Sequence, residues 1–555
     1  MKIALKIFLY SRIFIFSFMR KNNFSKIFRV LFYIFVFLFL LKNSYNYLDP
    51  DLGWHLKVGE RIMTEKQVPS INYYNYTLNN KKWVDHEWLS NAGMYLLYKN
   101  FGYASLNFLF ALVLLTALII LNVFTKKLLP RERGTPFFIF LLQFLGLMAM
   151  LPHIGVRIQE ITILNLLLLI ILIHRYEKTK NLKILFVLPC FFYFWACLHA
   201  GFLIGLFILV LWMAVRLAEL FIKKYWNPSF LDFNHDLKIR HIKNVFLFSV
   251  LSALATLITP YGLELYSFLS GYKDTYYLKH VQEWLPIYYT PIMLWQLLYE
   301  SIAAVAIILV ALFSIKTKGR EYKINLWQMA VSALFLILAM KSKRHFPLFF
   351  IASFSMMTGF FSSYLKIPRE IMPREKSKPM LFVKIYVIAG LFLVSFLLLA
   401  RMNFTRDPFA SFCGSYPCEA VEFLKSNPRY HDLNIFNTYG WGGYLIWVWP
   451  EKQLFIDGRL PQYEFAGHTM MEEYHEFFNE DENEINNKLK QYDIKLVLLK
   501  KDRPRKLNWF EEYILQMNQE KINKKENELE NFLDNSNSWR KIYSDNASNI
   551  WTADF

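Results

Sequence analysis

The chain has 555 residues, of which 55% are hydrophobic and 18% are aromatic, and its mean hydropathy is positive. This balance excludes an ordinary soluble enzyme and indicates a membrane protein. The formal net charge of +19 would suit a nucleic-acid partner, but the Lys and Arg residues gather in short segments between apolar runs, so we exclude nucleic acid and expect basic loops that orient a membrane protein.

The N-terminal segment, residues 1–26, is basic and apolar but has no small-residue cleavage site before its basic cluster. We expect it to remain as a cytoplasmic or interfacial segment. From residue 27 to Arg401, apolar runs recur that are long enough to cross a hydrocarbon core of about 30 Å. The predicted transmembrane helices, about eleven in number, cover residues 27–46, 103–125, 136–152, 156–174, 182–198, 201–222, 244–259, 294–315, 325–340, 345–363 and 381–400.

Basic residues cluster at the N-terminus and after every second predicted span, where basic loops are expected to face the cytoplasm. Residues 47–102 instead balance acidic against basic residues and are expected on the other side. The pattern predicts a multi-pass membrane protein with a cytoplasmic N-terminus and an extracytoplasmic C-terminal domain. The abundance of Lys, Asn, Ile and Phe suggests a bacterial genome, so we expect the bacterial plasma (inner) membrane. One basic cluster, "KSKRHF" at residues 341–346, falls outside by this count. Either it binds an anion or one helix is miscounted.

Two carboxylates follow the first predicted span, in the stretch "YLDPDLGWHLKVGERI" of residues 47–62. Pro50 cannot continue a helical hydrogen-bond ladder, so the helix is expected to break there and to place Asp49 and Asp51 at the water interface. Such a pair could hold a divalent metal ion, or one member could act as a general base. Alternatively, the turn merely caps the amphipathic helix that follows. The sequence leaves metal binding open.

Further ionisable groups recur in the segments predicted on the same side of the membrane. The stretch "KKWVDHEWL" places Asp85, His86 and Glu87 between two tryptophans. A single His or Arg is commonly a packing or snorkelling residue, but ionisable groups at membrane depth usually mark a site. Others on this side are His55, His153, Arg157, His199, Lys273, Asp274, Lys343, Arg344 and His345. Acids near Asp49 and bases near Arg344 would form a bipolar cavity for a ligand with a hydroxyl and a phosphate.

These residues resemble those of GT-C superfamily glycosyltransferases, of the bacterial multi-spanning type related to the protein O-mannosyltransferase and lipid A aminoarabinose transferase families. The resemblance rests on "DPDLGWHLKVGE", "WVDHEWLS" and "RIQEITILNLLLL", and on many spans followed by a C-terminal module. It covers most of the chain, but motif agreement is strong only in the first loop and around residues 437–463. There, "NTYGWGGYLIW" and "FIDGRLPQY" are similar to the distal domain of uncharacterised bacterial membrane proteins.

The resemblance implies a GT-C-like transmembrane domain over residues 27–401, with a large first extracytoplasmic loop at 47–102. It also implies a polyprenyl-phosphate sugar donor and an outer-loop aspartate at the reacting centre, a position that Asp49 matches best and Asp51 second. We therefore predict a membrane glycosyltransferase that transfers a sugar to an extracytoplasmic glycan, lipid or protein acceptor.

In this hypothesis, Asp49 or Asp51 deprotonates the acceptor hydroxyl in one inverting displacement. The leaving phosphate is stabilised by Arg344, Lys343, His345 and Arg157. Consistent with a lipid-phosphate donor, the sequence has no P-loop and no Rossmann glycine pattern. Candidate contacts to sugar or acceptor are His55, Asp85, His86, Glu87, His153, His199, Asp457 and Arg459.

Residues 402–555 contain no spanning run and predict a small soluble α/β domain. Helical "CEAVEFLKSN" precedes the strand-like stretches "LNIFNT", "GGYLIWVW", "KQLFIDGR" and "IKLVLLK". The glycines of "GWGG" either allow a tight turn and close packing, or accompany an exposed Asp457 and Arg459 that bind a saccharide beside Trp441. Cys413 and Cys418 are spaced for a short-loop disulfide outside the cytoplasm; whether it forms stays open.

Two other functions compete with sugar transfer. A transporter or flippase for a lipid-linked or anionic substrate would also line a cavity with charge, and a noncatalytic membrane protein could bind cell-envelope glycan through its outer domain. The gathering of ionisable groups at one face, beside a large soluble domain, favours chemistry at that face.

Overall fold

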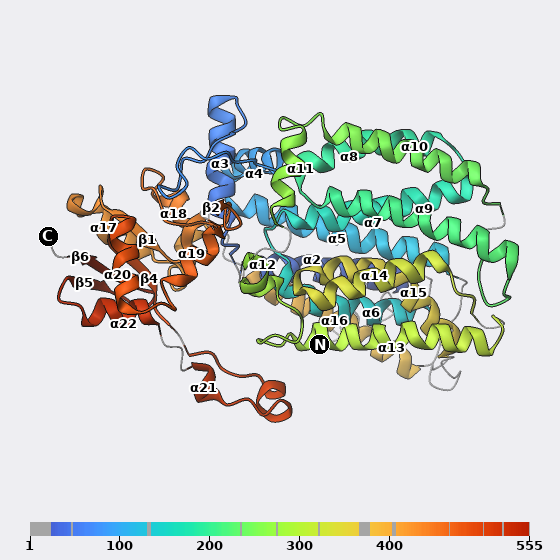
Figure 1. Ribbon diagram of the computed structural model, residues 1–555. Helices are drawn as coiled ribbons and strands as arrows, with labels where there is room; N and C mark the ends of the chain where they lie inside the picture. Colours follow the sequence, from blue (N-terminus) through green and yellow to red (C-terminus); the bar gives the residue numbers. More distant parts are fainter. Residues whose placement is uncertain are drawn as a thin grey trace, which may run out of the picture.

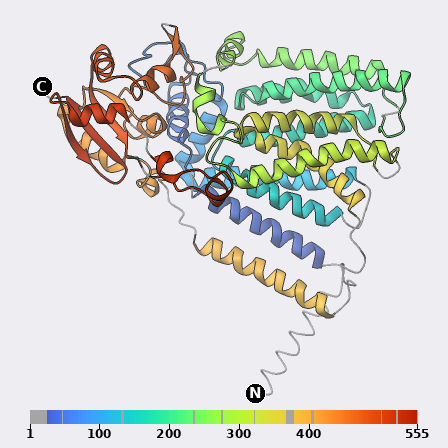
Figure 2. The ribbon, with the colours of Figure 1, turned by 60° about the horizontal axis from the view of Figure 1, so that its bottom comes forward.

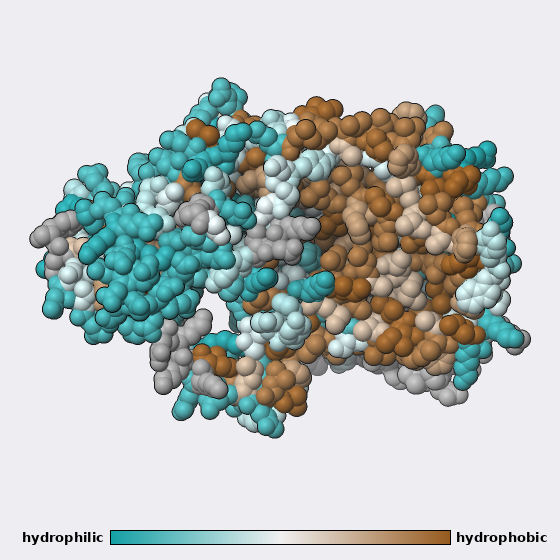
Figure 3. All heavy atoms as spheres, viewed as in Figure 1, coloured by the Kyte–Doolittle hydropathy of each residue, from teal (hydrophilic) through white to brown (hydrophobic). Residues whose placement is uncertain are grey.

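The computed structural model describes residues 24–45, 48–129, 135–233, 236–272, 276–319, 322–365, 378–401, 407–465, 467–502, 504–523 and 527–553. Long helices form one half of the molecule, and a smaller domain of helices and strands forms the other (Figure 1). Figure 3 shows a predominantly hydrophobic surface over the helices and a hydrophilic surface over the smaller domain. Residues 1–23 of the predicted N-terminal segment and the predicted site residues Lys273 and Asp274 lie outside the described residues.

Every predicted span overlaps a helix of the bundle. An apolar segment in lipid must satisfy its backbone hydrogen bonds internally, which selects the helix. The helices are α2 (Phe24–Ser44), α5 (Tyr103–Leu128), α6 (Thr135–Met150), α7 (Gln159–Thr179), α8 (Lys183–Leu198), α9 (Phe202–Tyr225), α10 (Ile239–Thr256), α13 (Leu294–Lys316), α14 (Leu326–Lys341), α15 (Phe346–Tyr364) and α16 (Lys378–Ala400).

Within the described part of the chain, 7 helices are long and apolar enough to cross a membrane, beginning in α2, α5, α6, α7, α9, α13 and at Lys343 just before α15. Three shorter apolar helices accompany them, Lys183–Leu198, Leu326–Lys341 and Ala389–Ala400. The chain is therefore a multi-pass membrane protein. The most apolar window of α15 is 83% buried, against 22% for α2, so α15 is a central helix. α16 lies beside α2 at the edge of the bundle (Figure 2).

Short helices connect the bundle to the C-terminal domain. The first loop contributes two of them, α3 and α4, which lie next to the smaller domain (Figure 1). Of the others, one follows α6, three lie between α10 and α13, and one lies between α14 and α15. Their bounds are α3 (Leu52–Glu65), α4 (Trp88–Phe101), η1 (Leu151–His153), α11 (Leu263–Ser270), α12 (Tyr276–His280), η2 (Gln282–Trp284) and η3 (Lys343–His345).

The C-terminal domain is built on a four-stranded sheet of order β1-β4-β6-β5. β1 (Asn434–Asn437) runs parallel to β4 (Ile494–Lys500), and β6 (Ser548–Ala553) runs antiparallel to both β4 and β5 (Trp539–Ser544). A small pair, β2 (Glu464–Phe465) and β3 (His468–Thr469), is antiparallel. The accompanying helices are η4 (Phe409–Phe412), α17 (Cys418–Lys425), η5 (Pro428–Tyr430), η6 (Tyr439–Trp441), α18 (Gly442–Val448), α19 (Met470–Glu476), α20 (Glu482–Gln491), η7 (Phe510–Ile514), α21 (Gln519–Asn523) and α22 (Glu528–Asn535).

The predicted α/β character of this domain is confirmed, but two of its four predicted strands are wrong. "CEAVEFLKSN" forms α17, and "LNIFNT" and "IKLVLLK" supply β1 and β4. "GGYLIWVW", predicted as a strand, is helical in α18. "KQLFIDGR" forms no extended strand and contributes only isolated bridges from Leu454, to Asn75 and Ile435. Apolar runs this short do not distinguish a buried strand from a buried helix by periodicity.

The first loop packs into the C-terminal domain rather than standing apart from it. Leu52 and Trp54 of α3 share one hydrophobic cluster with Leu445 of α18 and Phe455. A Cβ added to Gly53 would lie 2.1 Å from the carbonyl oxygen of Gly443. The two helices therefore touch backbone to backbone, which only glycine allows at such a distance.

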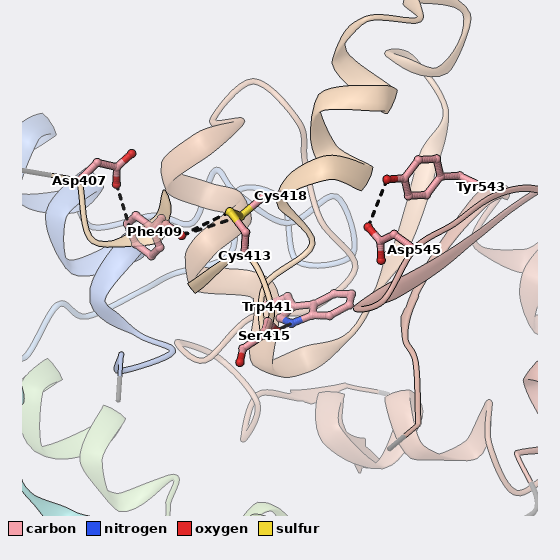
Figure 4. The surroundings of a disulfide bond; sticks show 8 residues. All are labelled: Asp407, Phe409, Cys413, Ser415, Cys418, Trp441, Tyr543 and Asp545. Atoms are coloured by element: carbon pink, nitrogen blue, oxygen red, sulfur yellow. Dashed lines mark hydrogen bonds between the residues drawn. A yellow bond between two sulfur atoms is a disulfide. The ribbon is translucent and has the colours of Figure 1, made fainter. Parts of the chain in front are cut away.

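A disulfide joins Cys413 and Cys418 in the segment that leads into α17 (Figure 4). Both sulfur atoms face the carbonyl oxygen of Phe409, and Trp441 Nε1 donates to Ser415 O at 3.0 Å. These contacts fix the entry of the chain into the C-terminal domain.

Candidate active site

A cavity of about 940 Å³ lies where the helix bundle meets the first loop and the C-terminal domain. The three parts of the chain each contribute to its wall. The predicted site residues that line it are Asp49, Asp51, His55, His86, Glu87, His153, Arg157, His199, Arg344 and His345. Groups that are far apart in the sequence, from the first loop to the start of α15, thus share one space.

The Asp49-Pro50-Asp51 turn follows α2 and precedes α3. Asp49 Oδ1 accepts a hydrogen bond from the backbone N–H of Asp51 at 2.9 Å, and Trp54 Nε1 donates to Asp51 Oδ1 at 2.9 Å. Asp51 occupies the N-cap position of α3, but its side chain makes no capping hydrogen bond. The Asp51 side chain therefore does not cap the helix, as the alternative interpretation of this turn had assumed.

Asp51 has the acid–base properties of a group poised near neutral pH. Burial and the adjacent charge of Asp49 raise the pKa of Asp51 to about 7, against the smaller lowering effects of the Trp54 hydrogen bond and Arg344. A carboxyl group with this pKa is present in both protonation states at neutral pH, so it can take up a proton there as a general base does.

Two arginines of the cavity share a single glutamate, and one of them also pairs with the aspartate turn. Arg157 Nε pairs with Asp49 Oδ2 at 2.6 Å, and its Nη1 pairs with Glu283 Oε2 at 3.0 Å. Arg344 Nη1 pairs with Glu283 Oε1 at 2.6 Å, and its guanidinium lies 4.7 Å from the ring centroid of Trp284. Burial would raise the pKa of Glu283, but Arg344 and Arg157 together lower it to about 2. Glu283 is therefore ionised and holds both cations in place.

Three imidazoles surround Glu87. His199 Nε2 and His86 Nε2 lie 3.4 Å and 3.6 Å from Glu87 Oε1, and His55 Nδ1 lies 3.9 Å from Oε2. Burial lowers the pKa values of His55 and His86 to about 4, and burial together with Asp85 raises that of Glu87 well above its usual range. His55 and His86 are therefore neutral at pH 7 and offer hydrogen bonds rather than charge.

The tautomer of His199 follows from its other ring nitrogen. The backbone N–H of Gly201 donates to His199 Nδ1 at 2.9 Å, and Thr162 Oγ1 lies 2.7 Å from the same atom. Because Nδ1 accepts, neutral His199 carries its proton on Nε2. This places a fixed N–H donor on the cavity wall.

Asp85 lies behind this wall and does not line the cavity. It accepts two hydrogen bonds from Asn91 Nδ2, both at 2.9 Å, and Asn91 Oδ1 lies 2.6 Å from His55 Nδ1. Burial raises the pKa of Asp85 to about 6, against the lowering effect of Asn91. Asp85 therefore positions His55 through Asn91 and does not face a ligand.

Three other predicted residues also lie elsewhere. Lys343 Nζ donates to the carbonyl oxygens of Tyr289 and Pro291 at 2.6 and 3.2 Å, so its ammonium stabilises a loop and is not aimed at the cavity.

The expectation of an exposed Asp457 and Arg459 is wrong, because they are 2% and 3% exposed and pair at 2.7 Å. The hydrophobic residues around them favour burial, and pairing offsets its cost.

Arg459 fastens the C-terminal domain to the first loop. Its Nη2 donates to Asn72 Oδ1 at 2.8 Å and Asn75 Oδ1 at 3.0 Å, and its guanidinium lies 4.7 Å from the ring centroids of both Tyr74 and Trp83. The "FIDGR" motif is thus a structural clamp.

The sequence analysis missed several cavity residues. Tyr272 and Tyr277 come from the charged segment before α13, and Tyr439 comes from η6 of the C-terminal domain. Glu283, from the same charged segment, stands in the ionisable stretch "YKDTYYLKHVQEW" but had been given no role. The tyrosines carried no charge to draw attention to them. Tyr439 could have been found from its position in "NTYGWGGYLIW", but only the glycines and the tryptophan of that motif were considered.

Glycines of this motif and of "FIDGR" bring the C-terminal domain onto the aspartate turn. A Cβ on Gly443 would lie 2.2 Å from the carbonyl oxygen of Pro50, and one on Gly458 would lie 2.2 Å from Asp51 Oδ1. Of the two interpretations of this motif, close packing is the one that the structure supports.

The cavity carboxylates are not arranged as a ready cation site. Asp49 Oδ2 is paired with Arg157, and Asp51 Oδ1 accepts from Trp54. Among the described residues, the group whose ligand atoms lie close enough to hold a metal ion is His468, Glu473 and Glu476, in the C-terminal domain. Lys488 Nζ already pairs with both of those glutamates, at 2.8 and 2.6 Å. A divalent ion at Asp49 would have to displace Arg157.

Solved structures resemble this architecture. The oligosaccharyltransferase of Archaeoglobus fulgidus, tethered to an acceptor peptide containing the NVT sequon, aligns with 87% of this chain and 70% of its own, at 11% identity and a TM-score of 0.50. The chain has a GT-C fold. An archaeal oligosaccharyltransferase from Archaeoglobus fulgidus in complex with an inhibitory peptide and a dolichol-phosphate aligns over 86% of this chain and 69% of its own, at 10% identity and a TM-score of 0.49. No family model and no curated protein matches the sequence.

The predicted fold class, a polytopic α-helical GT-C-like domain with a small C-terminal α/β domain, is confirmed by this likeness. Within this GT-C fold, the cavity lies between the ends of the membrane helices and the C-terminal domain.

Proposed function

We propose that the protein is a membrane glycosyltransferase that transfers a sugar from a polyprenyl-phosphate-linked donor to an extracytoplasmic acceptor. The observation that carries the proposal is the meeting of Asp51 with Arg157 and Arg344 in one cavity beside the apolar helices. A base and a pair of cations are what an acceptor hydroxyl and a lipid phosphate require. The GT-C fold, shared with an oligosaccharyltransferase whose structure holds an acceptor peptide, supports the same reaction class.

In the proposed reaction, Asp51 removes the proton from the acceptor hydroxyl. The hydroxyl oxygen forms a bond to the anomeric carbon while the bond from that carbon to the phosphate oxygen breaks, and the electron pair leaves with polyprenyl phosphate. The configuration at the anomeric carbon inverts. Asp51 is a better base than Asp49, because Asp49 is held in an ion pair with Arg157 and Asp51 has a pKa of about 7.

The leaving phosphate gains negative charge, and Arg344 is placed to receive it. The Arg344 side chain is 24% exposed, whereas that of Arg157 is 5% exposed. Arg344 therefore meets the phosphate directly, with Arg157 behind it and His345 beside Trp284. Charge stabilisation of this kind commonly contributes about 3 kcal/mol to lowering a barrier.

The wall formed by His55, His86, Glu87 and His199, together with His153, is proposed to bind sugar or acceptor hydroxyls. Sugars offer many hydroxyl donors and acceptors, and the fixed Nε2–H of His199 supplies a matching donor. The aromatic groups Tyr272, Tyr277 and Tyr439 provide apolar faces for a sugar ring.

We also propose that this end of the bundle faces away from the cytoplasm, in a bacterial plasma membrane with the N-terminus inside. The alternation of basic loops along the sequence supports that orientation. The Cys413–Cys418 disulfide supports it independently, because such bonds persist in oxidising compartments.

The test is to incubate the purified full-length protein with radiolabelled polyprenyl-phosphate sugars and a set of hydroxyl acceptors. An enzyme releases polyprenyl phosphate in step with label transfer, and Asp51→Asn stops both. A transporter moves the lipid across vesicles without consuming it, and a glycan-binding protein does neither. Donor consumption at the wild-type rate by Asp51→Asn would refute the assigned base.

A further inference from the structure

Residues 504–523 leave the body of the C-terminal domain and cross to the helix bundle. In Figure 1 this segment, which carries α21, lies apart from the sheet and beneath its neighbouring helices. It contains η7 and α21. Its polar groups make specific contacts, described next, that tie it to the membrane domain.

The tie is centred on Glu511, which is fully buried. Its Oε1 accepts from the backbone N–H of Ile292 at 2.8 Å, and Asn508 Nδ2 donates to Ile292 O at 3.2 Å. Arg505 pairs with the same carboxylate. Ile292 lies two residues before α13 (Leu294–Lys316), a helix long and apolar enough to cross the membrane. The segment is therefore attached at the very end of a membrane span.

Beyond this attachment the segment exposes large apolar side chains. Trp509 is 60% exposed, Tyr513 is 70%, Ile514 is 58% and Leu515 is 46%. Figure 3 shows hydrophobic surface on this excursion, below the hydrophilic body of the C-terminal domain. Four such residues in a short segment are unusual on a surface that faces only water.

The adjoining surface of α13 also exposes large apolar side chains. Trp295 and Leu298 are exposed on its first turns, and they begin a stripe that continues through Val305, Ile308 and Leu312 at helical spacing. This stripe faces lipid if α13 spans the membrane. The exposed residues Trp509, Tyr513, Ile514 and Leu515 belong to the segment attached at its end, where a bilayer has its interface and where Trp and Tyr are enriched.

We propose that residues 504–523 form an interfacial membrane anchor, in which Trp509, Tyr513, Ile514 and Leu515 insert into the bilayer surface next to the start of α13. The partner is the lipid bilayer, because the exposed side chains are continuous with a lipid-facing stripe. The anchor also bears on the cavity, since Pro291 and Met293 on either side of Ile292 line it. The segment thus ties one wall of the cavity to the membrane surface. This inference does not depend on sugar transfer.

The experiment uses the full-length protein with Cys190→Ser, which removes the exposed free cysteine. Tyr513→Cys is labelled with an environment-sensitive fluorophore and compared with Glu482→Cys, on the exposed face of α20 in the same domain. Both proteins are placed in nanodiscs of phosphatidylcholine and phosphatidylglycerol, with or without lipid that carries a doxyl quencher near the headgroup. Aqueous iodide is the second quencher.

The label at 513 is expected to be quenched several-fold more by doxyl lipid than the label at 482, and several-fold less by iodide. Adding Trp509→Ser should reduce the doxyl quenching at 513, because it removes a neighbouring insertion point. Equal quenching at the two positions would overturn the proposal. Protection from iodide without doxyl quenching would also overturn it, since the surface would then be covered by protein.

Discussion

Gly458 of the C-terminal domain lies against Asp51 of the first loop so closely that a Cβ on Gly458 would fall 2.2 Å from Asp51 Oδ1. A domain that begins more than 350 residues later in the chain therefore fixes the position of the proposed base. Under the proposed function, this packing positions the base.

Gly458→Ala is expected to displace the Asp51 carboxylate and to lower the rate of sugar transfer about 100-fold, because misplacing a reacting group by about 1 Å has an effect of that size. The measurement is single-turnover transfer by protein of verified folding. Gly414→Ala is the control, since a Cβ there meets nothing within 4 Å. Unchanged transfer by Gly458→Ala would contradict the role given to this contact.

The pH dependence should report the ionisation of Asp51. A general base acts in its deprotonated form, so kcat/KM should rise about tenfold per pH unit at acidic pH and level off above the pKa of about 7. Asp49→Asn removes a nearby negative charge and should move this inflection to lower pH, whereas Asp51→Asn should abolish it. A pH profile that keeps its inflection in Asp51→Asn would assign the titration to another group.

Arg344 should act on the chemical step. Arg344→Gln removes the guanidinium that meets the leaving phosphate and is expected to lower kcat about 10²- to 10³-fold. Lys341→Gln, an exposed cation three residues earlier, should leave kcat unchanged and so serves as the matched control. If both substitutions had the same small effect, general attraction of anions would explain it better than a phosphate contact.

Arg459 should contribute to stability. Arg459→Gln leaves the buried Asp457 carboxylate without its cation and is expected to destabilise the fold by about 3–5 kcal/mol. Thermal unfolding of the full-length protein in detergent measures this, with the exposed Arg429→Gln as the comparison. A normal melting temperature combined with lost saccharide binding would restore the interpretation rejected above.

The sequence was sufficient to predict the membrane domain. The apolar runs are long, and in lipid a chain of that length has few alternatives to a helix, so α2, α5 and α13 were found close to their observed bounds. The short apolar runs of the C-terminal domain were harder. "IKLVLLK" and "GGYLIWVW" are similar in length and apolarity, yet one is β4 and the other is mostly α18, because their tertiary neighbours decide.

The candidate site, too, was predicted from the sequence in part only. The chain by itself determined that aspartates, histidines and arginines lie at one end of the helices, because hydrophobic spans fix where each connecting segment emerges. Only the tertiary structure decided which of them share a cavity. In the folded protein, Arg157 and Arg344 both pair with Glu283. Arg459 is buried beside Tyr74 and Trp83, and Lys343 donates to backbone carbonyls. Side-chain direction depends on packing partners that are distant in sequence, and local pattern carries no record of them.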